Sequence, residues 1–341
     1  MKHIQKNPEN QLREKLSHIP AIKNLSLGER DGNILDGTIE TQCDNAIRLI
    51  TVDKGFPKNI ERAVLASRDR KGECYCIVIA PYISNSSAEL CKKLGAGYLD
   101  YSGNCLISME DIYLSDVGHP NLFPKEDKVK NPFKSSSVVT SRILREMLAD
   151  TSVRWKIQDL SKKIGCSIGM VSRVKDYLCD QLWGEMGPSG FCVTDAEAIL
   201  HEWSHSFSHD GINIINTYTS DDIAEAEGKL SDVLKSNSYM GGFTGFSGGV
   251  RYAPVVRYTR IHMWIAADHA YDFIKQSGLK EVDSGANVMV YVASGDDVFV
   301  DLREKDGIPI VSPVQVYLDL MNLQARGEEM AEAVLKKEVI K

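Results

Sequence analysis

Residues 201–205, HEWSH, contain the residue types and the spacing of a zinc-peptidase site. On a helix, His201 and His205 would share a face and could bind Zn²⁺, with Glu202 as the general base. Three nearby residues could supply a further ligand: His209, Glu225 and Glu227. The same stretch has apolar residues at helical spacing: Ala198, Ile199 and Trp203. They favour a helix that mainly packs, so we expect neither a bound metal nor catalysis here.

A second group of residues has the character of a phosphate-binding surface. From Lys134 to Thr194 the chain has nine Lys/Arg and six Asp/Glu, a local charge of +3 in a protein of net charge −7. Positive charge is needed where DNA phosphates are to be bound. We expect ten residues to contact double-stranded DNA: Arg154, Lys156, Lys162, Lys163, Ser167, Gly169, Ser172, Arg173, Lys175 and Ser189. Ser172 and Arg173 are candidates for base edges, and the lysines for the backbone.

Three helices and a hairpin are predicted to position these side chains. Apolar residues recur at helical spacing in residues 136–150, with Ser137 or Thr140 as N-cap, and in 157–164, where Gly165 ends the helix. A third helix follows Ser167, with a buried face of Val171, Val174 and Leu178 and an outer face of Gly169, Ser172, Arg173 and Asp176. Residues 187–190, GPSG, then join two short apolar runs. This order predicts a winged helix-turn-helix with a trailing helix over residues 135–210, although such modules also mediate protein contacts without DNA.

The composition is that of a globular cytoplasmic protein. Of the 341 residues, 43% are apolar and 26% charged. The first 16 residues contain no apolar signal region, and no run approaches the ~20 apolar residues that cross a bilayer. The eight cysteines form no C-x-x-C pair and lie mostly in apolar runs, so we expect buried thiols. Cys74 and Cys76 share a strand face, but two ligands without a nearby histidine do not make a metal site.

The helical module separates two α/β segments. Residues 1–120 read as strand, helix, strand, helix, strand, which predicts an α/β domain with a partly parallel sheet. Residues 121–134, rich in proline and mixed charge, are the predicted linker. Residues 211–341 alternate predicted helices and strands and form a second α/β domain, in which Ser312 caps a helix that has Pro313 at its first position.

Several strings resemble the AbiEi-type antitoxins of type IV toxin–antitoxin systems. They are IAPYIS at 79–84, GYLDYSGNC at 97–105, YMGGFTGFSGGVRYAP at 239–254, SPVQVYLDL at 312–320 and RGEE at 326–329. The resemblance spans most of the chain. It implies a transcriptional regulator that represses its own operon and offsets a partner toxin resembling nucleotidyltransferases. The best-known members place the winged helix at the N-terminus, whereas here an α/β segment of about 130 residues precedes it.

The N-terminal segment resembles a restriction-endonuclease core. Such a core holds its metal with an acid on one strand and an E-x-K pattern on the next. The corresponding positions are Asp44 and Val52-Asp53-Lys54. Valine offers no oxygen to Mg²⁺, and using Asp53 instead would turn it to the other face of the strand. We therefore expect a degenerate, endonuclease-like domain that does not cleave DNA.

The C-terminal segment contains glycines and acids, but no nucleotide-binding pattern. The glycines of residues 241–249 are followed by no Gly-Lys-Ser/Thr, and residues 260–264 lack the D-x-D/E of a nucleotidyltransferase. We interpret these glycines as a turn between packed elements. Three acids could bind a cation: Asp296, Asp297 and Asp301. A hairpin turn at residues 294–297 and a solvated strand explain them better.

Taken together, these patterns predict an operator-binding regulator. It would act as a homodimer on double-stranded DNA, with no cofactor, no membrane association and no catalysis of its own. Two enzyme alternatives remain: a nuclease using Asp44 and Lys54, and a zinc peptidase at His201 and His205.

Overall fold

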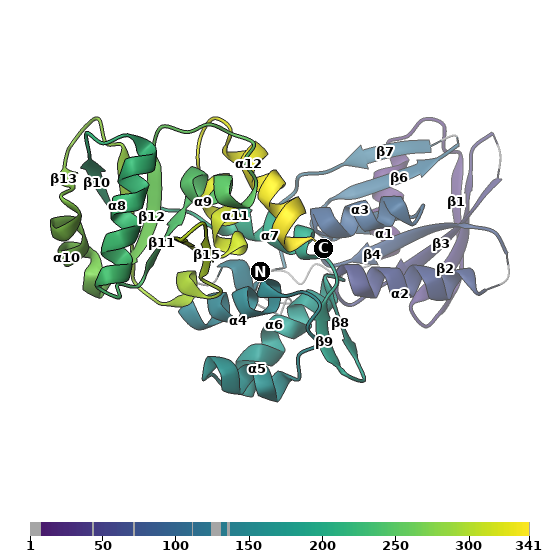
Figure 1. The fold of residues 1–341 in the computed structure, drawn as a ribbon. Helices are drawn as coiled ribbons and strands as arrows, with labels where there is room; N and C mark the ends of the chain where they lie inside the picture. The colour runs from purple at the N-terminus through teal and green to yellow at the C-terminus, as the bar shows by residue number, and fades with distance from the viewer. Residues whose placement is uncertain are drawn as a thin grey trace. The chain divides into compact units, whose positions relative to one another are not determined.

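The computed structural model describes residues 8–42, 44–70, 72–110, 112–123, 131–134 and 137–340. The protein divides into two compact units, residues 1–130 with 179–182, and residues 131–178 with 183–341 (Figure 1). Both units combine helices with a seven-stranded sheet, which confirms the predicted α/β class. Cys43 and residues 124–130 of the predicted linker lie outside the described residues.

The first unit has a mixed sheet whose strands are arranged in chain order. These are β1 (Asn24–Asp31), β2 (Ile34–Glu40), β3 (Asp44–Thr51), β4 (Tyr75–Ala80), β5 (Gly97–Asp100), β6 (Cys105–Met109) and β7 (Ile112–Asp116). Strands β3, β4 and β5 are parallel, and all other pairs are antiparallel. The helices are α1 (Pro8–Ser17), α2 (Pro57–Arg68) and α3 (Asn85–Lys93). The predicted order, which corresponds to β3, α2, β4, α3 and β5, and the partly parallel sheet are confirmed. Strand β6 was not predicted as separate from β5, and α1, β1, β2 and β7 were not predicted at all.

Aliphatic side chains fill both faces of this sheet. Because successive strand residues point to opposite faces, Ile77 and Ile79 pack with Leu12 and Leu16 of α1. Val78 instead packs with α2 and α3 on the other face. Burial on both sides explains why β4, YCIVIA, is a continuous apolar run rather than an alternating one.

The second unit begins with a group of helices and a hairpin. In chain order these are η1 (Pro132–Lys134), α4 (Val138–Ala149), α5 (Ile157–Ile164), α6 (Ile168–Asp180), β8 (Gly184–Gly187), β9 (Gly190–Val193) and α7 (Ala196–Ser206). The hydroxyl of Ser137 caps α4 by accepting from the Thr140 amide at 3.4 Å. Gly165 ends α5 at φ 76°, in the left-handed region, as predicted. The strands β8 and β9 form an antiparallel hairpin.

A second seven-stranded sheet completes this unit, in the order β13-β10-β14-β12-β11-β16-β15. The strands are β10 (Asn213–Tyr218), β11 (Gly241–Thr244), β12 (Ile261–Ala266), β13 (Lys280–Glu281), β14 (Val288–Ala293), β15 (Arg303–Lys305) and β16 (Ile308–Ile310). The helices and turns are α8 (Ile223–Ser236), α9 (Gly245–Tyr252), α10 (Ala267–Ser277), η2 (Asp297–Phe299), α11 (Pro313–Met321), α12 (Gly327–Val334) and η3 (Leu335–Val339). Helices α8 and α10 pack on one face, where Met263 and Phe273 lie in the same core (Figure 1).

Two predictions for this unit are wrong. Residues 294–297 form no hairpin turn, because β14 already pairs with β10 and β12 and the chain leaves the sheet into η2. The glycine-rich segment is not a turn but the strand β11 and the helix α9. A Cβ at Gly248 would lie 2.9 Å from the Phe243 carbonyl oxygen, and one at Gly249 2.9 Å from the Met330 side chain. The glycines therefore permit close packing of α9.

No helix in the described part of the chain is both long and apolar enough to span a membrane.

Candidate nucleic-acid interface

Helix α6 is anchored through one face. Val171, Val174 and Leu178 are buried, as their spacing predicts. Tyr177, on the same helix, joins an aromatic cluster whose ring centroids lie 5.8 to 6.2 Å apart: Phe133, Tyr177, Trp183 and Trp203. This cluster connects η1, α6, the start of the hairpin and α7. It fixes the orientation of α6 and so determines which residues face solvent.

The opposite face of α6 exposes small and basic residues near its N-terminus. Ser167, Gly169 and Arg173 are exposed and Ser172 is half-buried. Arg173 Nε donates to the Gly169 carbonyl at 3.2 Å. Gly169 has open space where a Cβ would be, so a ligand backbone can approach closely. Ile168 is 50% exposed, and sequence reasoning did not include it. The sequence feature that could have identified Ile168 is an apolar residue directly after the predicted N-cap.

The predicted basic residues differ in whether a carboxylate already neutralises them. Arg154 lies 3.7 Å from Glu185, Lys163 lies 2.5 Å from Glu146, and Lys175 pairs with Asp176. Lys163 also lies over the Trp155 ring, 5.2 Å from its centroid. In contrast, three cations have no carboxylate partner within the described ranges: Lys156, Lys162 and Arg173. Only unneutralised cations keep their full charge for a phosphate.

The β8–β9 hairpin is held against the strand-like residue before α5. The Trp155 amide donates to the Phe191 carbonyl at 2.7 Å, and the Phe191 amide donates back at 2.9 Å. Gly190, at φ 131°, permits this approach, because a Cβ there would lie 2.7 Å from the Trp155 carbonyl oxygen. Pro188 and Ser189 at the tip are exposed. Met186 is also 51% exposed and was missed by sequence reasoning.

The HEWSH residues lie on α7 without a complete ligand set. His201 and His205 are exposed, with ring centroids 4.5 Å apart, while Trp203 packs inward. Each proposed third ligand is engaged elsewhere: His209 bonds to Asp319, Glu225 to Lys229, and Glu227 to Arg251 and Tyr258. No three His, Cys, Asp or Glu residues gather as a metal site anywhere in the described residues.

The nuclease candidates do not converge either. Asp44 and Thr51 are the two ends of the single strand β3, and Asp53 and Lys54 follow that strand instead of lying on the next one. The expected placement of an acid on one strand and E-x-K on its neighbour is therefore wrong. Val52 is 8% exposed and belongs to the aliphatic core with Val64. It has a packing role that a carboxylate could not fill.

The three acids near η2 are ion-paired with arginines. Asp296 accepts from Arg142 at 2.9 Å, Asp297 lies 3.8 Å from Arg145, and Asp301 accepts from Arg303 at 2.6 Å. Their carboxylates serve three different contacts and do not face a common cation.

A buried polar cluster under the second sheet was not predicted. Asp319 of α11 is fully buried, and four side chains donate to its carboxylate: His209, Thr244, Trp264 and Gln315. The Trp264 Nε1 and Gln315 Nε2 bonds are both 2.7 Å long. The available signal was a single aspartate inside the apolar helical run VQVYLDL. A buried charge requires such partners, which orient α11 against the sheet.

His262 lies beside this cluster and is held neutral. It is 4% exposed, and burial lowers its pKa to about 4, with a smaller opposing effect from Asp319. The Tyr291 ring lies between two histidines, with centroids 4.8 Å from His209 and 6.1 Å from His262. The cluster therefore combines one carboxylate with a neutral imidazole in a setting closed to solvent.

The comparisons with known proteins give one match. Residues 192–340 match the family model described as "Transcriptional regulator, AbiEi antitoxin, Type IV TA system". The match covers the end of β9, α7 and the whole second sheet, but not α4, α5 or α6, and it does not reach the N-terminal strings. No curated protein and no solved structure matches the chain, so the expected endonuclease likeness has no support. Residues 192–340, less than half of the chain, are therefore similar to the AbiEi antitoxin family of type IV toxin–antitoxin systems.

Proposed function

We propose that this chain is a DNA-binding transcriptional regulator of a toxin–antitoxin operon, and that residues 137–206 act as a winged helix-turn-helix. Helix α6 would enter the major groove of operator DNA, and the β8–β9 hairpin would contact the adjacent backbone. One observation carries this proposal. Helix α6 is fixed by a buried face while its opposite face presents Arg173 without a carboxylate partner among the described residues.

The positions of the other basic residues support the same surface. Lys156 immediately precedes α5, and Lys162 lies in its last turn; both are exposed. Cations at such positions suit phosphates that flank a groove-bound helix. Lys163, which Glu146 and Trp155 already contact, should contribute less than Lys162. The family description, a transcriptional regulator, agrees with this use.

Two finer parts of the proposal concern partners. A homodimer would present two copies of α6 to a palindromic operator, because half-site spacing follows the two-fold symmetry of the protein. The second partner is a toxin resembling nucleotidyltransferases, whose effect the chain would offset while repressing their shared operon. The family description names an antitoxin of a type IV system, which supports such a partner.

The proposal is tested by fluorescence anisotropy with DNA from upstream of the gene and with a scrambled duplex. We expect binding to weaken with salt at a slope of about −0.9 per neutralised phosphate. Arg173→Ala should reduce the free energy of binding to the specific duplex by about 1 to 3 kcal/mol, and that to the scrambled duplex by less. Lys162→Ala should weaken both duplexes alike and reduce the salt slope by about one.

Lys275→Ala is the matched control, because Lys275 is an exposed lysine of α10 in a different part of the same unit (Figure 1). It should leave both affinities unchanged. Absence of binding at low salt, or an equal loss in Arg173→Ala and Lys275→Ala, would contradict the proposal.

A further inference from the structure

A cavity of about 600 Å³ lies inside the second unit, between the helices of the proposed DNA-binding module and the second sheet. Its walls come from η1, α4 and α7 on one side and from β10, β12, β14 and the loop before η2 on the other. Cavities of roughly 300 to 1,000 Å³ are the size that proteins use for small ligands. Neither the family match nor the DNA-binding surface accounts for it.

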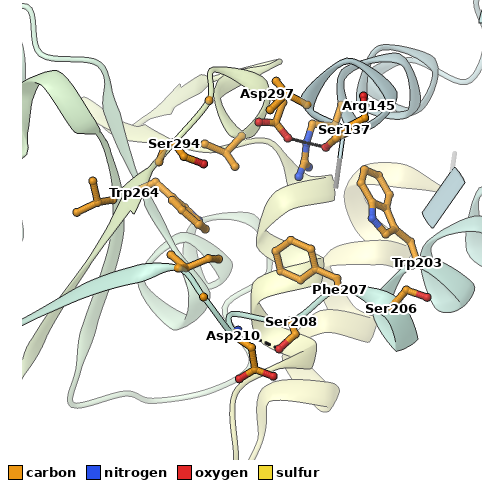
Figure 2. A pocket seen from close by; sticks show the side chains of 18 of the residues that line it. Ser137, Arg145, Trp203, Ser206, Phe207, Ser208, Asp210, Trp264, Ser294 and Asp297 are labelled. Atoms are coloured by element: carbon orange, nitrogen blue, oxygen red, sulfur yellow. Dashed lines mark hydrogen bonds and ion pairs between the residues drawn. The ribbon is translucent and has the colours of Figure 1, made fainter. Parts of the chain in front are cut away.

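Arg145 of α4 enters this cavity with an incomplete set of partners. Its side chain is 2% exposed, Nε donates to Ser141 Oγ at 3.2 Å, and the guanidinium lies 4.9 Å from the centre of the Trp203 ring. The nearest carboxylate, Asp297, is 3.8 Å from Nε, beyond hydrogen-bond distance. Nη1 has no hydrogen-bond partner in the described part of the chain. Figure 2 shows Arg145 reaching from α4 toward the space that Trp264, Phe207 and Trp203 surround.

A buried guanidinium with an unpaired donor is costly. Burial lowers the pKa of Arg145, which Asp297 and Asp319 oppose, yet arginine keeps its proton in proteins. The missing interaction is one that an oxyanion supplies best, because carboxylates and phosphates match the N–H fork of arginine. Asp210 and Asp297 also line the cavity, which disfavours a ligand with many negative charges.

The rest of the lining suits a flat apolar group. Trp203, Phe207 and Trp264 present aromatic surface from three different elements, α7, the segment after it and β12. Serine hydroxyls at the margin, including Ser137 and Ser294, can satisfy polar substituents of a ring. Aromatic walls with a few polar groups are typical of small-molecule sites.

We propose that this cavity binds a small molecule with a planar ring and a single oxyanion, which Arg145 Nη1 would receive while the ring lies among Trp203, Phe207 and Trp264. A carboxylate and a phosphate monoester share this chemistry.

The loop that lines the cavity contacts α4 directly, so a bound ligand would influence DNA binding. Arg142 of α4 donates to Asp296 at 2.9 Å, and a Cβ at Gly295 would lie 2.9 Å from the Val138 side chain. The loop before η2 therefore touches the first turns of α4. A ligand that changes this contact changes how α4 supports α6 and the hairpin, so ligand and DNA should bind with coupled affinities. This regulatory part rests on the proposed function, whereas the ligand site does not.

The full-length protein is titrated with benzoate, phenyl phosphate and benzamide, the last being a neutral analogue of benzoate. Tryptophan fluorescence is the readout, because two of the four tryptophans line the cavity, and calorimetry gives the stoichiometry. We expect one of the two anions to bind at a one-to-one ratio and benzamide to bind about tenfold or more weakly. Comparing the affinities of benzoate and phenyl phosphate shows whether the site prefers a carboxylate or a phosphate.

Three variants locate the site. Arg145→Gln should weaken the anion by about tenfold or more without lowering Tm, since it removes an incompletely paired buried charge. Arg257→Gln, at an exposed arginine elsewhere in the same unit and with the same loss of charge, should leave binding nearly unchanged because Arg257 does not line the cavity. Ser294→Phe fills the cavity from an exposed loop position and should abolish binding even if Arg145→Gln does not fold.

Three results would overturn the inference: neither anion binds at about 10 mM, benzamide binds as well as benzoate, or Ser294→Phe binds like the wild type. DNA affinity is then measured with and without the bound anion. Equal DNA affinities would refute the regulatory part alone, whereas loss of DNA binding under all conditions would refute the proposed function and leave the ligand site standing.

Discussion

The two seven-stranded sheets of this protein differ in what covers their faces. The first sheet has aliphatic side chains on both faces. Among the described residues, its one fully buried carboxylate is Asp100, which accepts from the backbone amides of Ile83, Ser102 and Asn104 and from the Asn104 side chain. The second sheet has an apolar core under α8 and α10. Its other face carries His262 and Trp264 against Asp319, and it opens toward the cavity with Arg145.

This difference indicates where the molecule is built for recognition. Asp100 accepts mainly from its own loop, residues 102–104, and also from the Ile83 amide after the neighbouring strand β4, so its polar interactions are structural. Asp319 instead accepts from three residues far away in the chain, and Arg145, which contacts the distant Trp203 and Asp297, has a donor without a hydrogen-bond partner in the described part of the chain. Incompletely paired polar groups in a pocket mark ligand sites more reliably than aliphatic cores do.

The largest expected effect is on Asp319. Asp319→Ala leaves four donors unpaired inside the second unit and should reduce its free energy of unfolding by about 3 to 5 kcal/mol. Urea denaturation followed by tryptophan fluorescence measures this, because all four tryptophans, Trp155, Trp183, Trp203 and Trp264, lie in the second unit. Asp100→Ala is the matched variant in the first unit and should leave that tryptophan transition in place. If Asp100→Ala shifts it as far as Asp319→Ala does, the two clusters are not independent.

Acid should affect the stability of the two units differently because of His262. Its folded pKa of about 4 lies below the ordinary 6.5, so the unfolded chain takes up the proton first. The second unit should therefore lose up to about 3 kcal/mol of stability as pH falls from about 6.5 to about 4, with no further loss from this group below that. Burial raises the pKa of Asp100. This shift has the opposite effect on stability, because protonation of Asp100 increases the free energy of unfolding of the first unit as pH falls.

His262→Phe is the test of that assignment. Tryptophan-detected unfolding at several pH values should show a shallower acid dependence in His262→Phe than in the wild type. An unchanged acid dependence would contradict the assignment to His262.

Removing a helix N-cap should have a smaller effect on stability, and this effect should also differ between the two units. Ser312 Oγ accepts from the Gln315 amide at 3.2 Å and is buried, so Ser312→Ala should cost about 1 kcal/mol and loosen the helix that carries Asp319. Ser84 caps α3 of the first unit with a 3.3 Å bond to Ser87. Ser84→Ala should leave tryptophan-detected unfolding unchanged and appear only in far-ultraviolet circular dichroism.

The smallest effect is expected at the former nuclease positions. Asp44→Ala and Lys54→Ala should each change stability by less than about 0.5 kcal/mol, because Asp44 is exposed and Lys54 only half-buried. Supercoiled DNA incubated with the wild type and Mg²⁺ or Mn²⁺ should remain intact. Metal-dependent cleavage that Asp44→Ala abolishes would reverse our interpretation of the first sheet.

Periodicity in the sequence located most of the elements near the proposed DNA surface. The spacing of Val171, Val174 and Leu178 identified the buried face of α6, and Gly165 the end of α5, because helical period and backbone chirality are local properties. Elements with weak local signals were missed, including β1, β2 and the short β7. The hairpin at 294–297 was wrong because strand pairing, which sequence order does not reveal, had already occupied both edges of β14.

The sequence by itself determined the α/β class, the chain order of the helices in the proposed DNA-binding module and the similarity of residues 192–340 to the AbiEi antitoxin family. Only the tertiary structure decided which charged residues are free. It neutralised Lys163 and Lys175, left Lys162 and Arg173 without carboxylate partners in the described ranges, and separated His209 from His201 and His205. It also brought Arg145 into a cavity with tryptophans 58 and more residues away in the chain. The physical reason is that periodicity depends on neighbouring residues, whereas pairing and burial depend on contacts that the chain makes only when it is folded.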